Sequence, residues 1–64
     1  GGTACAVLNG ANEAAVSLFL ENKIGFNDIS RRVRRAMDTV AAVDHPSLED
    51  ILAADRAARD SVYG

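Results

Sequence analysis

Cysteine, histidine and proline each occur only once in these 64 residues, and tryptophan is absent. Because Cys5 has no second cysteine to pair with, an internal disulfide and a multi-cysteine zinc site are excluded, and the composition fits a reducing compartment. His45 is equally isolated, so histidine and cysteine form no metal-ligand cluster. The sequence therefore lacks disulfides and structural metal sites, the two devices on which many small domains depend.

Long apolar runs and a basic excess are also missing. The apolar runs are only a few residues long, far below the ~20 residues of a membrane-spanning helix, and no charged segment leads into an apolar one as in a secretion signal. We therefore expect a soluble segment with no membrane partner and no targeting signal. Seven Lys and Arg against nine Asp and Glu give a net charge of −2, so nucleic-acid binding would need a local basic patch.

Alanine dominates the apolar residues that are present. Of the 31 hydrophobic residues, 12 are alanine and one is cysteine, which leaves 18 large apolar side chains. A domain of this size buries only about 60% of the surface that its unfolded chain exposes. The composition therefore predicts marginal stability or help from a partner.

Two breaks divide the chain into three helical stretches. The first break is residues 21–25, and the second is residues 43–46, where Pro46 disfavours the right-handed helical conformation in the residue before it. The pattern predicts helices over about residues 4–20, 28–41 and 47–62, and no segment has the composition of a strand. Because the loops are short, we expect one all-α domain over residues 1–64: three helices of a helix bundle, with up-down topology.

The first predicted helix is apolar on more than one face. Thr3 is its candidate N-cap; one wide arc holds most of the apolar residues, while Val16 and Leu20 lie nearly opposite. Two neighbouring helices would not cover such a helix, so we expect self-association of the isolated segment through Val16 and Leu20. Gly10 in its interior indicates either the close approach of another element or neutral drift.

The other two predicted helices each carry one apolar stripe. The second has Asn27 or Asp28 as its N-cap and Phe26 as a hydrophobic staple outside the helix. The third begins at Ser47, with two acidic residues in its first turn, where the helix dipole favours them. The stripes are Ile29, Val33, Ala36, Met37 and Val40 in the second helix, and Leu48, Ile51, Leu52, Ala58 and Val62 in the third.

A polar network is expected between the first and third helices. Asp55 and Arg59 fall within the apolar stripe of the third helix, four residues apart, in the acid-before-base order that suits an ion pair. Asn12 borders the apolar arc of the first helix, and a buried amide needs hydrogen-bond partners. We therefore expect Asn12, Glu13, Asp55 and Arg59 to form a structural polar network and not a catalytic site.

The second helix concentrates positive charge. Four of the seven basic residues occur within five positions: Arg31, Arg32, Arg34 and Arg35. They form either an anion-binding face or the solvated side of an amphipathic helix. The solvated side is favoured, because no aromatic residue accompanies the arginines and no glycine-rich phosphate loop precedes them. His45 lacks an oriented partner for general-base catalysis, and Cys5 is interpreted as a small buried apolar group.

Several blocks of residues resemble one known family. The blocks are Ala-Val-Leu-Asn-Gly-Ala-Asn-Glu-Ala-Ala-Val at residues 6–16, Phe19-Leu20, Ile24-Gly25-Phe26, Asp28-Ile29, Ser-Leu-Glu-Asp-Ile-Leu-Ala-Ala-Asp at residues 47–55, and Ala58-Arg59. In this order and spacing they resemble the C-terminal helical domain of 1-deoxy-D-xylulose 5-phosphate reductoisomerase over nearly the whole chain. The sequence departs from that family's pattern at Cys5, where proline is common, and at Gly10, where alanine is usual.

The resemblance implies a larger parent enzyme. Such an enzyme is an oxidoreductase of non-mevalonate isoprenoid biosynthesis that uses NADPH and a divalent cation, Mg or Mn, to convert 1-deoxy-D-xylulose 5-phosphate to 2-C-methyl-D-erythritol 4-phosphate. It is a homodimer of the bacterial-type cytoplasm. Residues 1–64 would be the last three helices of its C-terminal four-helix bundle, whose first helix would lie just upstream of Gly1, and their partners would be the remaining domains of the parent chain.

The resemblance assigns no catalytic, cofactor-binding or metal-ligating residue to this segment, because none of the family's motifs for those roles maps onto it. The segment alone is therefore not expected to be active, and its expected role is structural. Two alternatives stay open. A small helical module could bind an anionic partner such as nucleic acid through the arginines of the second helix, in helix-turn-helix fashion. An independent small enzyme is least favoured, because no nucleophile, base and orienting group converge at any motif spacing.

Overall fold

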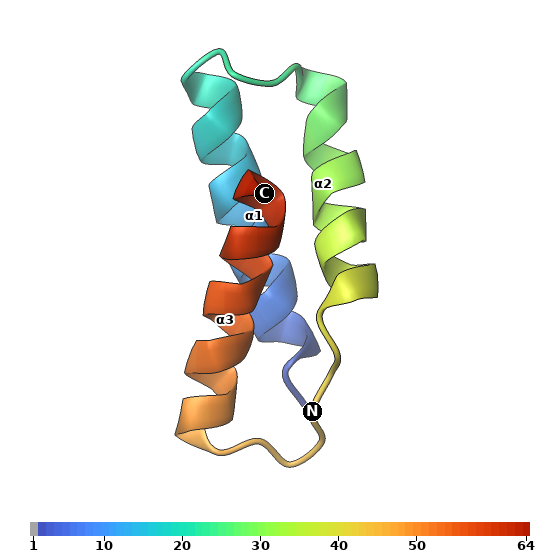
Figure 1. Cartoon of the computed structure of the whole chain (residues 1–64), viewed down its shortest axis with the longest axis vertical. Helices are drawn as coiled ribbons and strands as arrows, with labels where there is room; N and C mark the ends of the chain where they lie inside the picture. Colours follow the sequence, from blue (N-terminus) through green and yellow to red (C-terminus); the bar gives the residue numbers. More distant parts are fainter. Residues whose placement is uncertain (1) are drawn as a thin grey trace.

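Three helices make up the computed structural model, which describes residues 2–64. They are α1 (Ala4–Leu20), α2 (Phe26–Thr39) and α3 (Leu48–Tyr63). Figure 1 shows the helices lying along the long axis of the molecule, each running opposite to the one before it. The molecule is 36 Å long and 17 Å across. No strand occurs between residues 2 and 64, so the prediction of an all-α chain is confirmed.

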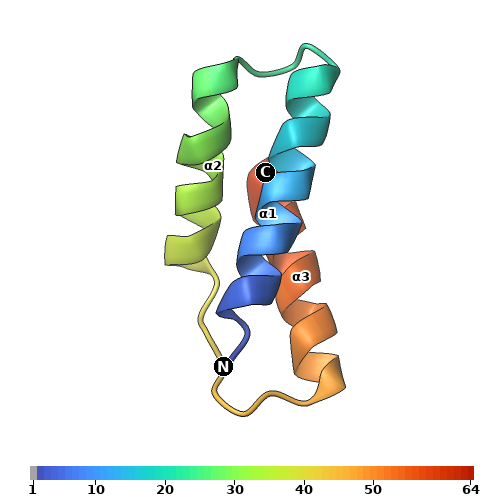
Figure 2. The same ribbon diagram turned by 180° about the vertical axis from the view of Figure 1, so that it is seen from behind.

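The helix α1 is the central element. It contacts α2 and α3 more extensively than those two contact each other, and Figure 2 shows α1 beside α2 with α3 behind α1. Six of the nine core residues are alanines, so the helices can lie close together but bury few large side chains. The core consists of Val7, Ala11, Ala14, Ala15, Leu18, Ala36, Ala54, Ala58 and Val62.

The backbone of α3 approaches α1 closely at Gly10. A β-carbon added to Gly10 would lie 2.6 Å from the Asp55 Oδ1 atom and 3.0 Å from the Asp55 carbonyl oxygen. A β-carbon there would require the Asp55 carboxylate to turn away and the backbone of α3 to shift by a few tenths of an ångström. Of the two explanations that the sequence left open for this glycine, close approach of another element is the one that the structure supports.

The helix α2 begins two residues earlier than predicted and ends two residues earlier, at Phe26 and Thr39. Neither Asn27 nor Asp28 is its N-cap, because the cap position is Gly25. The Asp28 carboxylate instead accepts a hydrogen bond from the Gly25 N–H at 2.8 Å, as the third residue of a capping box does. Phe26 lies inside the helix, and its ring meets the ring of Phe19 edge-on at 5.8 Å between centroids.

The start of α3 matches the prediction, but its buried stripe does so only in part, since Ala58 and Val62 are buried as expected and Leu48 and Leu52 are not. Ser47 is the N-cap, and its hydroxyl accepts a hydrogen bond from the Asp50 N–H at 3.1 Å, while Asp50 accepts one from the Ser47 N–H at 3.0 Å. The buried side chains come from one row of residues four apart, Ala54, Ala58 and Val62. Leu48 and Leu52 belong to a different row of the helix and are 70% and 56% exposed.

Two residues near the start of the chain also differ from expectation. Cys5 is exposed, because it lies on a side of α1 that neither α2 nor α3 covers. Thr3 occupies the N-cap position of α1 without capping through its side chain. Its hydroxyl oxygen accepts a hydrogen bond from the Val43 N–H at 2.9 Å, and its own N–H donates to the Val43 carbonyl at 3.1 Å. This pair of bonds ties the first residues of the chain to the α2–α3 loop.

We predict that Gly10→Leu destabilises the chain by more than about 2 kcal/mol, because a large side chain at a close-packed position must push α3 away from α1. Asn9→Leu is the matched control, since Asn9 is the exposed neighbour on the same helix; it should change stability by less than about 0.5 kcal/mol. Urea unfolding followed by circular dichroism measures both. Equal stability of the two variants would show that the helices are not in close contact at Gly10.

Candidate functional site

A polar cluster joins α1 to α3 beside Gly10. The Arg59 Nε atom donates to Asp55 Oδ2 at 3.0 Å along α3, and its Nη2 atom donates to Glu13 Oε1 on α1 at 3.3 Å. The side chains of Arg59 and Asp55 are 36% and 37% exposed, and that of Glu13 is 69% exposed. One guanidinium therefore bridges a carboxylate on its own helix and a carboxylate on the neighbouring helix.

Asn12 does not join this cluster. Its side chain is exposed, and within residues 2–64 no side-chain hydrogen bond involves it. The reason is the rotation of 100° per residue in an α-helix: Gly10 and Glu13 face α3, so Asn12 points to another side of α1. The expectation of a buried Asn12 with partners on α3 is therefore wrong, although Glu13, Asp55 and Arg59 do lie together.

The two carboxylates keep Arg59 charged. Hydrogen bonds from Arg59 to Asp55, and then to Glu13, raise the pKa of the guanidinium above its ordinary value. A raised pKa of a basic group adds stability that is present at low pH and is lost only as the pH rises through that pKa. Because arginine titrates far above neutral pH, this contribution does not vary across the physiological range.

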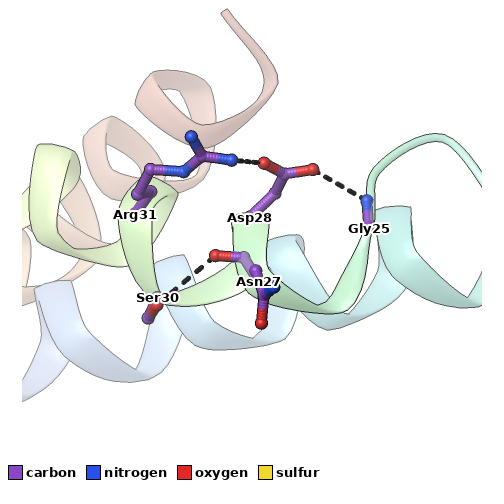
Figure 3. A network of polar contacts seen from close by, with 5 residues as sticks. All are labelled: Gly25, Asn27, Asp28, Ser30 and Arg31. Carbon is purple, nitrogen blue, oxygen red and sulfur yellow. Dashed lines mark hydrogen bonds and ion pairs between the residues drawn. The ribbon is translucent and has the colours of Figure 1, made fainter.

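A second polar cluster occupies one face of α2. Figure 3 shows Asp28 between Gly25 and Arg31: one carboxylate oxygen accepts from the Gly25 N–H, and the other pairs with the Arg31 guanidinium. On the same face, a cavity of about 440 Å³ is lined by Asp28, Arg31, Arg32 and Arg35. Arg34 does not line it, so the structure separates one of the four clustered arginines from the other three.

Two of these arginines hold the end of α3. Arg32 donates from Nη1 to the Val62 carbonyl oxygen, and Arg35 donates from Nη2 to the Ser61 carbonyl oxygen at 2.7 Å. Carbonyls in the last turn of a helix lack intrahelical partners and lie at the negative end of its dipole. The last turn of α3 has no basic residue of its own. The arginines of α2 therefore supply the positive charge that α3 lacks.

A smaller and mostly apolar cavity lies between α3 and the loop that follows α2. Its volume is about 210 Å³, and it is lined by Val40, Ala41, Val43, Asp50, Ala53, Ala54 and Ala57. Val43 is also the residue to which Thr3 is bonded. This cavity therefore opens beside the first residues of the chain.

The remaining candidates form no site. His45 is exposed in the α2–α3 loop with a φ of 51°, and Cys5 is exposed on α1. Within the described part of the chain, no three His, Cys, Asp or Glu side chains are grouped so that they could hold a metal ion. None of the helices of residues 2–64 has the length and apolar character needed to cross a membrane.

The sequence carried a signal for one contact that was not predicted. The last turn of α3 contains no Lys, Arg or His, which leaves its carbonyls to be satisfied from elsewhere. The cluster of arginines on the preceding helix was the second part of the signal, because arginine side chains can donate hydrogen bonds to those carbonyls. To predict this contact, one must know how α2 and α3 are aligned along their length. The spacing of residues within a single helix does not give that alignment.

We predict that Arg59→Met lowers Tm by about 2–5 °C, because it leaves Asp55 without its partner beside Gly10. Arg56→Met is the matched control, since Arg56 is an exposed arginine of α3 without an ion pair among the described residues; it should leave Tm unchanged. Thermal unfolding by circular dichroism at low salt compares them. A Tm for Arg59→Met at or above that of the unchanged chain would mean that the cluster is not important for the fold.

The chain matches one protein-family model, "DXP reductoisomerase C-terminal domain", over residues 1–61. It is 56% identical over 59 residues to a 1-deoxy-D-xylulose 5-phosphate reductoisomerase of Synechococcus sp. (strain JA-2-3B'a(2-13)), covering 92% of this chain and 15% of the relative. It is 55% identical over 64 residues to the protein of the same name from Microcystis aeruginosa, covering 97% of this chain and 16% of the relative. No solved structure matches the chain.

A third relative of the same name, from Caldanaerobacter subterraneus subsp. tengcongensis, is 44% identical over 62 residues and is again matched over 16% of its length. The chain thus spans about one sixth of the length of the relatives that it matches. These relatives do not support the alternative of a nucleic-acid-binding module. With a family model matched over nearly all of its residues, the chain belongs to the family of DXP reductoisomerase C-terminal domains.

Proposed function

We propose that this chain is the structural C-terminal domain of an enzyme that converts 1-deoxy-D-xylulose 5-phosphate to 2-C-methyl-D-erythritol 4-phosphate in non-mevalonate isoprenoid biosynthesis. The observation that carries the proposal is the family match over residues 1–61, together with the name that the relatives share. The parent would be a homodimer in the cytoplasm of a bacterial-type cell. This chain covers about one sixth of the length of each relative, so the substrate and the activity are those of the parent enzyme.

NADPH and a divalent cation belong to this proposal as cofactors of the parent. The described residues do not fit either group, since they contain no cluster of metal-ligating side chains and no glycine-rich loop at a helix start that would cradle a pyrophosphate. We therefore assign their binding, and the rearrangement and hydride transfer, to the parts of the parent outside these 64 residues. No residue of this chain is assigned a catalytic role.

The role left for this chain is to pack against the rest of the parent. Its surface supports that role, because several large apolar side chains lie outside the core. Those exposed by more than half are Leu20, Phe26, Leu48, Leu52 and Tyr63. Exposed apolar surface of this kind typically marks an interaction face. Leu48 and Leu52 lie one turn apart on α3, so together they offer one such face to a neighbouring domain.

The proposal includes a fourth helix of the bundle, upstream of Gly1. The contacts between α2 and α3 are the least extensive of the three helix pairs, and the 210 Å³ cavity lies between α3 and the loop that follows α2. The hydrogen bonds between Thr3 and Val43 hold the beginning of the chain beside that cavity. A helix preceding Gly1 would therefore begin beside the cavity between α3 and the loop that follows α2.

Removal of residues 1–64 from the parent should abolish NADPH-dependent turnover of 1-deoxy-D-xylulose 5-phosphate or make the parent insoluble, because the truncated protein would lose a domain that holds the others in place. The assay is NADPH oxidation by the full and truncated proteins, and the 64 residues alone should show no turnover. Normal activity of a soluble truncated parent would contradict the structural role while leaving the family membership intact.

The isolated 64-residue chain should self-associate, because Leu20 is 72% exposed and its apolar surface has no partner. Sedimentation velocity over a range of concentrations detects this. Leu20→Gln should shift the distribution toward monomer, whereas Glu21→Gln, a change at the neighbouring exposed position, should not. A clean monomer at high concentration would contradict the prediction.

A further inference from the structure

The arginine-lined cavity on α2 is built from one face of one helix. Asp28, Arg31, Arg32 and Arg35 follow the spacing i, i+3, i+4 and i+7, which places all four side chains on the same side. The cavity is open to solvent on one side, and its volume of about 440 Å³ falls within the range of small-molecule pockets. Three guanidinium groups and one carboxylate therefore line a space large enough for a small ligand.

The charges in this cavity do not balance. The carboxylate of Asp28 is already used twice, by the Gly25 N–H and by Arg31. Arg32 and Arg35 meet only neutral main-chain carbonyls of α3, and none of the ion pairs among residues 2–64 contains either of them. Three positive charges against one negative charge leave a formal surplus of two.

The guanidinium groups are also held in place with donors to spare. Each has five N–H donors in a planar fork, and Arg32 and Arg35 each spend one on α3. A side chain that is already anchored loses less conformational entropy when a ligand binds, which favours affinity. Arginine forks suit the oxygens of phosphate because they can donate two parallel hydrogen bonds.

We propose that Arg31, Arg32 and Arg35 form a binding site for a phosphate-type dianion, either inorganic phosphate or the phosphoryl group of a phosphate monoester. A dianion balances the surplus of two positive charges, which a single carboxylate does not. The site is a compact cavity and not a long basic surface: Arg34 lies outside it, and the chain as a whole has a net charge of −2. These features favour a small ligand over a nucleic acid.

The test is a titration of the ¹⁵N-labelled 64-residue chain, with ionic strength held constant by sodium chloride. Three probes are added separately: inorganic phosphate, glycerol phosphate as a phosphate monoester, and acetate. We expect saturable shifts of the Arg32 and Arg35 side-chain Nε–H signals and of the Ser61 and Val62 amides, with Kd on the order of 1 mM for phosphate. Tighter binding of glycerol phosphate than of inorganic phosphate would identify a monoester as the ligand; the reverse would identify the free ion.

Single variants separate the site from general charge effects. Arg31→Gln should weaken phosphate binding at least fivefold. Because Arg31 makes no bond to α3, this change leaves intact the hydrogen bonds from Arg32 and Arg35 to the end of α3. Arg34→Gln is the matched control, with the same loss of charge on the same helix outside the cavity, and should change Kd less than twofold. Shifts that rise linearly without saturation, equal effects of the two variants, or acetate binding as tight as phosphate would each overturn the proposal.

Discussion

The close approach of α3 to α1 at Gly10 is the constraint on which the rest of the structure depends. Because no side chain separates the helices there, Asp55 comes within 3.0 Å of where a β-carbon would be, and Arg59 then reaches Glu13 on the opposite helix. The same approach suits a core in which alanine is the commonest residue. Helices packed this closely gain many small van der Waals contacts but bury little large apolar surface. The stability of the chain is therefore limited, because this packing leaves many of the large apolar side chains outside the core.

Polar contacts compensate for what the thin core does not provide. Thr3 joins the beginning of α1 to the α2–α3 loop through two hydrogen bonds, and Arg32 and Arg35 join α2 to the last turn of α3. The first contact lies in the loop that follows α2 and the second in the middle of α2, which contacts α3 less extensively than α1 does. Each links residues that are far apart in the sequence, so together they restrict how α2 and α3 can slide against each other. They also place the arginines on the surface in a fixed arrangement.

Features governed by local chemistry were predictable from the sequence, and features governed by helix register were not. The three helices, the turn before Pro46 and the start of α3 at Ser47 depend on neighbouring residues, and each was predicted within about two positions. The capping bonds of Ser47 are equally local, although they were not predicted. The pairing of Asp55 with Arg59 depends on a spacing of four within one helix. Asn12 and Cys5 were wrongly expected to be buried, because their burial depends on which side of α1 faces the other helices. The distribution of apolar residues along α1 could not show that Asn12 and Cys5 lie outside the core, because α1 is apolar on more than one side.

The same distinction explains why this chain carries so little chemistry of its own. A catalytic site needs groups of different kinds that converge on one reacting atom, and here the groups that converge are those that hold helices together. Glu13, Asp55 and Arg59 satisfy one another, while Arg32 and Arg35 are bonded to the backbone of α3. What the structure leaves unsatisfied is of two kinds: large apolar side chains that are exposed on all three helices, and the positive charge of the α2 cavity. The first suits a domain that is packed against a larger protein, and the second suits a small anion, so the functional surfaces of the chain are those that its own folding does not use.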